Sequence, residues 1–513
     1  MSPSAEAPQS YEREDEYDVV VLGAGPTGEV LAERVRAAGL STAVVERELI
    51  GGECSYWACI PSKALLRPIA ALAGARAVEG ARQAVNGGPD AAAVLARRNG
   101  FTSDWKDDGQ VAWLGSEGAE IVRGSGRLDG PRRVVVRTPD GGLRLLRARH
   151  AVAVCTGSRA VVPDLPGLAE ARPWTSREAT SAQKVPGRLA IVGGGVVGVE
   201  MATAWQALGS QVTMLVRGGG LLERMEPFAG EMVTEGLARA GVEMLIGVSA
   251  TGVRREAPGG PVTVLMDNGR EIVVDEVLVA TGRAPRTDGL GLETVGLSPG
   301  GWIEVDDSCR VTGVPGDWLY AAGDVNHRAL LTHQGKYQAR VAGAVIATRA
   351  QHVPVLERDR WGAHVATADR AAVPQVVFST PEVAAVGLTA AEAERQGRRV
   401  RVVDYELGQV AGASLYEDGY RGRARMLVDL DRGHLIGVTF VGPGVGELLH
   451  SATVAVVGEV PVDRLWHAVP AFPTMSEVWL RLLEEYRGQQ LWPVGTPALT
   501  EPQAMAPGPG VGR

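Results

Sequence analysis

Two stretches of the chain share one pattern of apolar and polar positions. Each opens with a short apolar run, Asp18–Leu22 in the first and Leu189–Val192 in the second. Such a run between turn residues is typical of a strand buried in a parallel sheet. A glycine-rich turn, an amphipathic helix to about Gly39 or Gly209 and a second apolar strand follow. This repeated βαβ unit predicts two nucleotide-binding domains on one chain.

The remaining pattern predicts how the two units are connected. We expect a β-meander over about 133–154, a loop-rich link over 163–186, and an α+β domain from about Val373. Within that last domain, strands are predicted over 424–428 and 434–441, followed by a helix over 446–457. The fold class is therefore α/β, with two Rossmann-like domains and a C-terminal α+β domain.

Composition narrows the classes of protein. With 513 residues, 45% hydrophobic and 22% charged, the chain is expected to form two to four globular domains. The net charge of −8 and the lack of a basic block make nucleic acid an improbable partner. No apolar run reaches the roughly 20 residues of a membrane span. We therefore expect a cytoplasmic protein, with disordered tails over 1–16 and 491–513.

The first glycine-rich turn has the residues that a dinucleotide requires. In this fingerprint the glycines allow a tight turn, a close approach of the backbone to a pyrophosphate, and packing of helix on strand. The pyrophosphate is expected at the helix N-terminus, where free N–H groups favour an anion. Glu46 ends the second strand, where its carboxylate can accept from ribose hydroxyls. The turn consists of Gly23, Ala24, Gly25, Pro26, Thr27 and Gly28.

The second glycine-rich turn lacks the acidic residue. Val216 occupies the matching strand end and Arg217 follows it. An arginine can pair with a 2′-phosphate that a carboxylate would repel, so we favour NADPH over NADH. Alternatively, Arg217 is a solvated surface charge. The residues of this turn are Gly193, Gly194, Gly195, Val196, Val197 and Gly198.

Two of the four cysteines, Cys54 and Cys59, lie close together in the sequence after a glycine pair. In a regular helix, five residues rise about 7.5 Å, more than the usual Cα separation in a disulfide. If the pair bridges, the helix must be broken or only beginning here. A thiol near a helix N-terminus has a lowered pKa. A metal site and two unconnected thiols are the alternatives, and no histidine nearby supports a metal. Cys155 and Cys309 are expected to be buried apolar residues.

The run from Cys54 through Cys59-Ile60-Pro61-Ser62-Lys63, within this dinucleotide context, resembles the class I pyridine nucleotide-disulfide oxidoreductases over about 17–486. Further marks of that family are Thr156-Gly157, Ala280-Thr281-Gly282-Arg283, Ala322-Gly323-Asp324 and the stretch 377–389. The resemblance implies an FAD domain over 17–160 and 288–365, a NAD(P)H domain over 161–287 and a dimerisation domain over 366–490. It also implies a homodimer whose active sites are completed by the partner.

The resemblance assigns roles to individual residues. Cys59 would be the thiol next to the flavin, and Cys54 would exchange electrons with the substrate. Lys63 would lie near the flavin and pair with Glu200. The FAD contacts implied are Gly23, Gly25, Pro26, Thr27, Gly28, Glu46, Gly52, Lys63, Gly126, Thr156, Gly157, Gly323 and Asp324. The NADPH contacts implied are Gly193, Gly195, Val197, Gly198, Glu200, Arg217 and Gly282, and no metal ligands are expected.

The chain departs from this family at its acid/base residue. Disulfide-reducing members have His-x-His-Pro-Thr-x-x-Glu near the C-terminus, whereas Phe472 stands here at the second histidine. Glu477, the usual orienting partner, is retained, and His467 is the nearest histidine in sequence. A positioned acid/base contributes about 10²–10⁴ in rate, so fast reduction of small disulfides is not expected.

Other departures lie beside the cysteines. Glu53 replaces the usual threonine and is expected to raise the pKa of Cys54. Tyr56 and Trp57 either line a substrate channel or pack against Phe472 and the dimer core. The leading prediction is an NADPH-dependent FAD reductase whose small-molecule acceptor is a quinone, a metal ion or a specialised compound. Alternatives are dithiol-driven carbon chemistry, as in 2-ketopropyl coenzyme M carboxylase, and a redox-sensing flavoprotein. No cysteine follows Cys309, which disfavours mercury detoxification.

Overall fold

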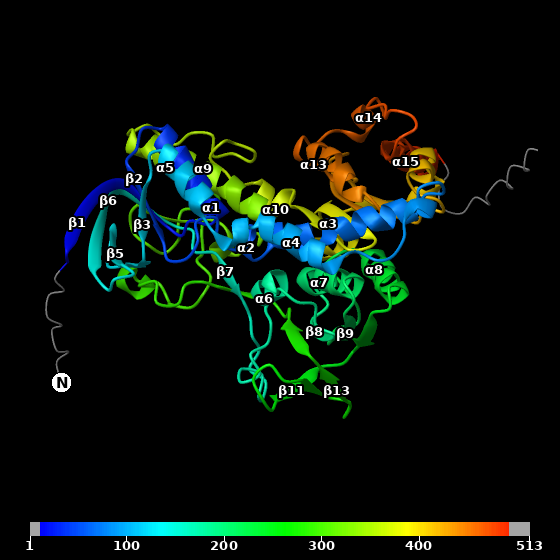
Figure 1. Cartoon of the computed structure of the whole chain (residues 1–513). Helices are drawn as coiled ribbons and strands as arrows, with labels where there is room; N and C mark the ends of the chain where they lie inside the picture. The colour runs from blue at the N-terminus through cyan, green and yellow to red at the C-terminus, as the bar shows by residue number, and fades with distance from the viewer. Residues whose placement is uncertain (1–10, 492–513) are drawn as a thin grey trace, which may run out of the picture.

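The computed structural model describes residues 11–491 and has three regions (Figure 1). The first repeat unit builds a seven-stranded sheet of order β3-β2-β1-β6-β5-β4, with β16 pairing β6. The strands of this region are β1 (Arg13–Leu22), β2 (Thr42–Glu46), β3 (Glu120–Arg123), β4 (Ser125–Leu128), β5 (Arg133–Arg137), β6 (Leu143–Val154) and β16 (Leu319–Ala321). Its helices are α1 (Pro26–Ala37), α2 (Gly52–Tyr56), α3 (Cys59–Arg76), α4 (Ala91–Phe101), α5 (Asp108–Ser116) and α9 (Thr332–Ala350).

The pairing of β1 explains how the first site is built. β1 lies parallel to both β2 and β6, so the carboxyl ends of these strands meet at one edge of the sheet. The expected antiparallel meander is formed by β4, β5 and β6. Helices α1 and α9 pack on one face, where apolar residues of both helices join the buried strand residues. The ligand-binding edge is therefore held by the central core.

The N-terminal tail was predicted too long. Residues 13–16 belong to β1 and pair with β6. Arg144 contacts Asp15 at 2.7 Å, and Arg149 contacts Glu16 at 2.9 Å. These partners are more than a hundred residues away, so local composition could not reveal them. Residues 1–10 and 492–513, which include most of the two expected tails, lie outside the described residues.

The second repeat unit builds a parallel sheet of order β10-β9-β8-β14, accompanied by an antiparallel sheet β11-β12-β13. This region lies at the bottom of Figure 1. Its strands are β8 (Arg188–Val192), β9 (Gln211–Val216), β10 (Glu243–Ile246), β11 (Ala250–Arg255), β12 (Val262–Met266), β13 (Glu271–Val274) and β14 (Glu276–Val279). Its helices are α6 (Ser176–Ser181), α7 (Val196–Ala207) and α8 (Pro227–Arg239), and the short strands β7 (Ser158–Ala160) and β15 (Arg283–Pro285) pair where it joins the first region.

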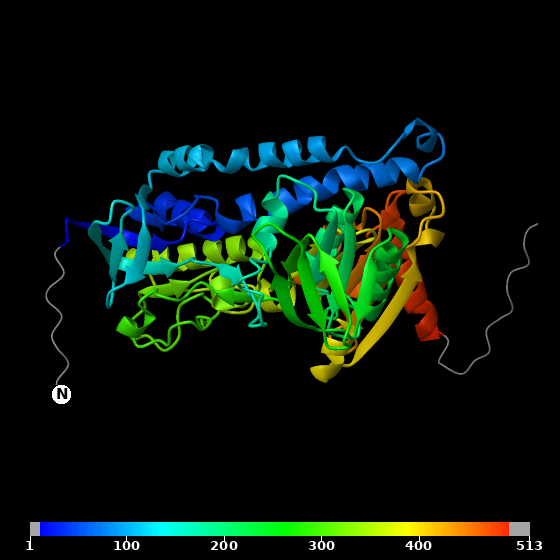
Figure 2. The same ribbon diagram turned by 60° about the horizontal axis from the view of Figure 1, so that its bottom comes forward.

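The third region is an antiparallel sheet of order β17-β18-β21-β20-β19, as the α+β pattern predicted. Figure 2 shows its strands and helices at the end of the molecule opposite the first region. The strands are β17 (Pro374–Val377), β18 (Glu382–Gly387), β19 (Val400–Glu406), β20 (Arg423–Asp429) and β21 (Leu435–Gly442). The helices are α10 (Ala368–Ala371), α11 (Ala390–Arg395), α12 (Ala411–Tyr416), α13 (Leu449–Val457), α14 (Val462–Leu465) and α15 (Val478–Leu491). Among the described residues, no helix is long and apolar enough to cross a membrane.

Substitution of Gly28 by alanine should destabilise the first region, because a Cβ there would lie 1.9 Å from the carbonyl oxygen of Gly23. We expect a loss of about 1–3 kcal/mol, seen as a melting temperature at least about 3 °C lower for the FAD-free protein. Gly115→Ala is the matched control, because Gly115 lies in α5 with no atom within 4 Å of an added Cβ. Equal melting temperatures for the two variants would contradict the packing argument.

Candidate active site

A cleft of about 380 Å³ opens at the carboxyl edge of the first sheet. Its volume falls in the usual range for ligand sites. Of the residues that the resemblance implied for FAD, all except Gly28 and Lys63 line this cleft. These lining residues are Gly23, Gly25, Pro26, Thr27, Glu46, Gly52, Gly126, Thr156, Gly157, Gly323 and Asp324. The fold therefore gathers into one cavity residues that span three hundred positions of sequence.

The turn between β1 and α1 fits a dinucleotide. Gly25 is the N-cap of α1, and no side chain caps the helix, so its first N–H groups remain available to an anion. Gly52 packs on this turn, since a Cβ at Gly52 would lie 2.8 Å from the Cα of Gly25. At the cleft, the buried hydroxyl of Thr156 has no hydrogen-bond partner among the described residues. Close backbone approach and unused polar atoms are the features expected of an FAD site.

The two carboxylates predicted to hold FAD, Glu46 and Asp324, both line the cleft and have different partners. Glu46, at the end of β2, accepts hydrogen bonds from the backbone N–H of Ala24 at 2.7 Å and of Glu48 at 2.8 Å. Asp324 follows Gly323, accepts from the Ser158 hydroxyl and lies 3.8 Å from Arg283. Burial raises the pKa of Asp324, while Ser158 and Arg283 oppose that rise.

The helix break expected between the two cysteines is present. α2 ends at Tyr56, Ala58 has φ −136° and ψ −96°, and α3 begins at Cys59. Both cysteines are half-buried thiols in this structure. The Cys59 sulfur lies 3.3 Å from the Thr332 hydroxyl at the start of α9. The sequence motifs did not indicate Thr332, because its proximity depends on the packing of α9 against the first sheet.

The surroundings of the pair give the two thiols different pKa values. A hydrogen bond from Cys54 is the main cause that lowers the pKa of Cys59 to about 6, with further help from Thr332 and from the charge of Lys63. The pKa of Cys54 is raised, mainly by that interaction with Cys59 and by burial. Cys59 is therefore the thiolate at neutral pH. The sequence analysis expected Glu53 to raise the pKa of Cys54. That pKa is raised, but the main causes are Cys59 and burial rather than Glu53.

Lys63 forms the predicted ion pair. Its ammonium group lies 2.8 Å from the Glu200 carboxylate, which is almost fully buried on α7. The other carboxylate oxygen of Glu200 accepts from the backbone N–H of Phe378 at 3.0 Å, and Lys63 lies 5.0 Å from the centre of the Phe378 ring. This contact joins α3, α7 and the third region at one point. The sequence analysis included Phe378 in the family-like stretch 377–389 but assigned it no contact with Lys63 or Glu200.

The second glycine-rich turn repeats the packing of the first. A Cβ at Gly198 would lie 2.3 Å from the carbonyl oxygen of Gly193, so helix and strand approach closely. Gly195 is the N-cap of α7, again with no capping side chain. Arg217 directly follows β9, is exposed, and forms no ion pair with the described residues. Val197 is also exposed on α7, and Gly282 has a φ of +145° in the segment leading to β15.

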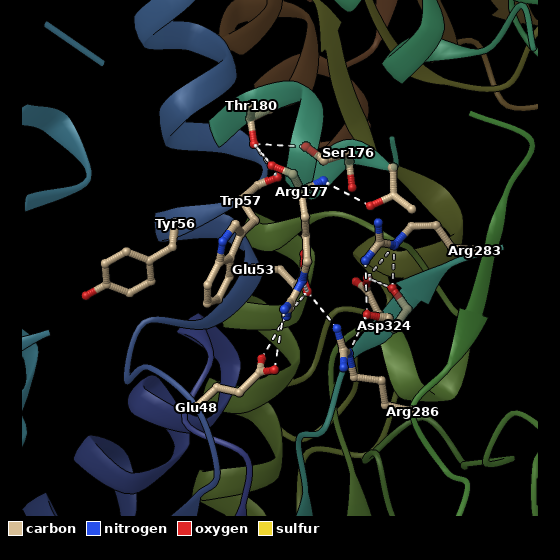
Figure 3. A network of polar contacts seen from close by, with 12 residues as sticks. Glu48, Glu53, Tyr56, Trp57, Ser176, Arg177, Thr180, Arg283, Arg286 and Asp324 are labelled. Atoms are coloured by element: carbon tan, nitrogen blue, oxygen red, sulfur yellow. Dashed lines mark hydrogen bonds and ion pairs between the residues drawn. The ribbon is translucent and has the colours of Figure 1, made fainter. Parts of the chain in front are cut away.

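A charged network beside Cys54 was missed by the sequence analysis (Figure 3). Arg177 of α6 donates to Glu53 at 2.6 Å and to Glu48 at 2.8 Å. Arg286 donates to the same Glu53 carboxylate at 2.7 Å. The Arg177 guanidinium also lies 4.1 Å from the centre of the Trp57 ring. Only the unusual Glu53 gave a sequence signal, because its two arginine partners lie more than a hundred positions away.

The aromatic residues between the cysteines contribute to local packing. Tyr56 is buried, and its hydroxyl lies 3.3 Å from the carbonyl oxygen of Lys106 and 3.2 Å from Gln110. Trp57 lies under Arg177, and its carbonyl oxygen accepts from the Thr180 hydroxyl at 3.0 Å. Cys155 and Cys309 are buried as predicted, and burial raises the pKa of Cys155 to about 12.

The C-terminal motif lies on the third region. The Phe472 side chain is 75% exposed in the single chain. Glu477 is buried and pairs with Arg481 at 2.6 Å through one oxygen, while its other oxygen has no partner among the described residues. His467 is exposed. In the family motif this glutamate orients a histidine. Here Phe472 takes the histidine position, and the partner of Glu477 is Arg481.

Comparison with known proteins places the chain in a family. The model for the pyridine nucleotide-disulphide oxidoreductases matches residues 17–348, and the model for the dimerisation domain of the same family matches residues 373–482. The chain therefore belongs to the pyridine nucleotide-disulphide oxidoreductases. It is an enzyme of the kind that contains FAD and uses NAD(P)H.

Relatives and solved structures match along almost the whole chain. A mercuric reductase of Acidithiobacillus ferrooxidans is 33% identical over 482 residues, covering 93% of this chain and 84% of that protein. A dihydrolipoyl dehydrogenase of Haloferax volcanii is 31% identical, covering 92% and 97%. The structure of LpdA from Mycobacterium tuberculosis has a TM-score of 0.76 at 25% identity, covering 92% and 99%. The flavoprotein disulfide reductase RclA of Escherichia coli, at 24% identity and a TM-score of 0.77, supports the fold.

The reduced enzyme should form its thiolate at low pH. With the pKa of Cys59 at about 6 against an ordinary value of 9.0, the ultraviolet absorbance of the thiolate should rise as the pH passes through about 6. Lys63→Met and Thr332→Val should each move that transition to higher pH, because each removes an interaction that favours the thiolate.

Cys155→Ser is the control for this titration, because Cys155 is buried and its pKa of about 12 lies above the range measured. Loss of the transition in Cys155→Ser, or identical transitions in wild type, Lys63→Met and Thr332→Val, would contradict the assignment.

Proposed function

We propose that this enzyme transfers electrons from NADPH through FAD to the Cys54–Cys59 pair, and from there to an acceptor that needs no proton from position 472. The observation that carries the proposal is the combination of a complete thiol site with a phenylalanine in the acid/base position. Quinones and metal ions are the acceptor classes that fit best, and a specialised small molecule is the third. We also propose that it works in the cytoplasm.

The side chains around Cys59 support the electron-transfer half of this proposal. Bound FAD supplies a two-electron carrier between the pyridine nucleotide and the thiol pair. Thr332 and Lys63 favour the thiolate form of Cys59, while Cys54 retains its proton. Two thiols with such different pKa values can have different tasks: one exchanges electrons with the flavin, and the other reacts with the acceptor. A scaffold or sensor has no need, in addition, for the ion pair between Lys63 and the buried Glu200.

Phe472 supports the other half of the proposal. A phenyl ring can neither donate nor accept the proton that a leaving thiolate requires. The loss of a positioned acid corresponds to about 3–5 kcal/mol in barrier height. Glu477 is buried and paired with Arg481, so it is not an exposed proton donor that could replace the histidine. The names of the relatives include both mercuric reductases and dihydrolipoyl dehydrogenases, so a metal-ion acceptor and a thiol substrate both occur among them.

We further propose a homodimer in which Phe472 of one subunit faces the cysteine pair of the other. The match to the family's dimerisation domain supports this arrangement. The exposed position of Phe472 in the single chain also supports it, because large aromatic side chains are usually buried in an assembly. In such a dimer the ring would exclude water from the Cys54 side of the site.

An anaerobic titration with NADPH, followed by acceptors, tests the electron-transfer proposal. Reduction should produce a long-wavelength absorbance that is absent in Cys59→Ser. Quinones or metal ions should then reoxidise the protein rapidly, and small disulfides should not. Phe472→His should increase disulfide reduction by about tenfold or more, because it restores a proton donor.

Phe472→Leu is the control for the histidine variant, since it changes the shape without adding a proton donor. Rapid turnover of small disulfides by the wild type would refute the proposed acceptor class. If Phe472→His gains no more than Phe472→Leu, the proton-donor argument is wrong.

The preference for NADPH is proposed from Arg217. Arg217→Ala should raise the KM for NADPH about tenfold and leave that for NADH unchanged, because only NADPH has the 2′-phosphate. Arg239→Ala is the control, since Arg239 lies on α8 and pairs with Glu235 at 3.5 Å. Equal effects of Arg217→Ala on both nucleotides would show that Arg217 does not select the phosphate.

A further inference from the structure

Four of the charged residues that line the FAD cleft outside the family motifs form one network. They are Glu48, Glu53, Arg177 and Arg286, and they lie beside the residues of the glycine-rich turn. Figure 3 shows the two arginines converging on Glu53 from different segments, Arg177 from α6 and Arg286 from the chain after β15. The proposed electron transfer assigns none of them a task.

The position of Glu53 raises an electrostatic problem. Glu53 directly follows Gly52, which packs on Gly25 at the N-terminus of α1. That terminus is where a pyrophosphate binds in such a fold. A carboxylate beside a doubly charged pyrophosphate would repel it unless cations intervene. The two arginines therefore have to compensate Glu53 before the cleft can accept an anion.

Arg286 has donors left for such an anion. Its Nη2 donates to Glu53 at 2.7 Å and its Nε to the carbonyl oxygen of Ser158 at 3.0 Å. Its Nη1 has no partner among the described residues. The guanidinium is largely buried, and this burial lowers the pKa of Arg286. A fixed, half-desolvated guanidinium with a free N–H is suited to phosphate recognition.

Arg177 is held in place by its surroundings. Its ion pairs with Glu48 and Glu53 and the face of Trp57 fix the guanidinium. The helix that carries it is anchored at its end by the fully buried Arg98, which donates to the carbonyl oxygens of Thr180 and, at 2.7 Å, of Ala182. Such support reduces the motion of the side chain before a ligand binds.

We propose that Arg286, supported by Arg177, binds the pyrophosphate of FAD, and that Glu53 is a positioning residue that holds both guanidinium groups at the cleft. Two arginines, one of them from α6 beside the second repeat unit, thus take part in holding the cofactor of the first unit. The two guanidinium groups compensate the charges of Glu53 and Glu48, so the carboxylates no longer repel an anion. The remaining N–H donors of Arg286 then bind the phosphates.

Binding to the FAD-free protein tests this proposal without turnover, using ADP and adenosine as probes. ADP carries the pyrophosphate and adenosine does not. Arg286→Gln should weaken ADP and FAD by about ten- to a hundredfold and leave adenosine unchanged, as measured by calorimetry. The affinities of Arg286→Lys for ADP and FAD should lie between those of the wild type and those of Arg286→Gln, because lysine keeps the charge but lacks the planar fork of donors. The affinity of the wild type for ADP should also fall more steeply with salt than that of Arg286→Gln.

Arg188→Gln is the matched control, because Arg188 also forms one ion pair, with Asp275 at 2.8 Å, and does not line the cleft. Each variant is compared only if its melting temperature matches that of Arg188→Gln. Wild-type affinity for ADP in Arg286→Gln would overturn the proposal. Equal weakening of ADP and adenosine would also overturn it, since the arginine would then only maintain the shape of the cleft. Neither result depends on which compound accepts electrons.

Discussion

The interruption between α2 and α3 is the constraint on which the site depends. A continuous helix would separate Cys54 and Cys59 by about 7.5 Å of rise and would give both thiols similar surroundings. The unusual backbone of Ala58 instead starts a new helix at Cys59. The two sulfurs then interact; Thr332 reaches both thiols, and the charge of Lys63 further favours the thiolate of Cys59. The difference in pKa between the two thiols follows from this geometry.

Contacts between distant regions hold this arrangement. Lys63 on α3 pairs with Glu200 on α7, which in turn accepts a hydrogen bond from the backbone at Phe378. One buried carboxylate thus connects the thiol helix, the second glycine-rich helix and the third region. Burying such a charge is unfavourable unless its partners are well placed, so the three elements are restrained relative to one another.

At two places in the molecule, an arginine compensates the charge of a glutamate. Glu53 would be unfavourable beside an anion-binding turn, yet it lies between Arg177 and Arg286. Glu477 is similarly paired with Arg481 in the absence of a histidine neighbour. In both places the chain departs from its family at one residue, and an arginine from outside the motif interacts with it. The motif alone therefore shows the residue that differs from the family but not the arginine that interacts at that place.

The sequence by itself determined the repeated βαβ units, the cysteine pair, the glycine positions and the identity of residue 472, because these depend on spacing and residue type along the chain. Strand and helix boundaries agreed closely for the same reason. Only the tertiary structure decided that residues 13–16 extend β1, that Thr332 approaches Cys59, and that two arginines meet at Glu53. Each of these depends on side chains brought together across more than a hundred residues. Local pattern contains no information about which distant charges or hydroxyl groups the packing of helices and sheets will place there.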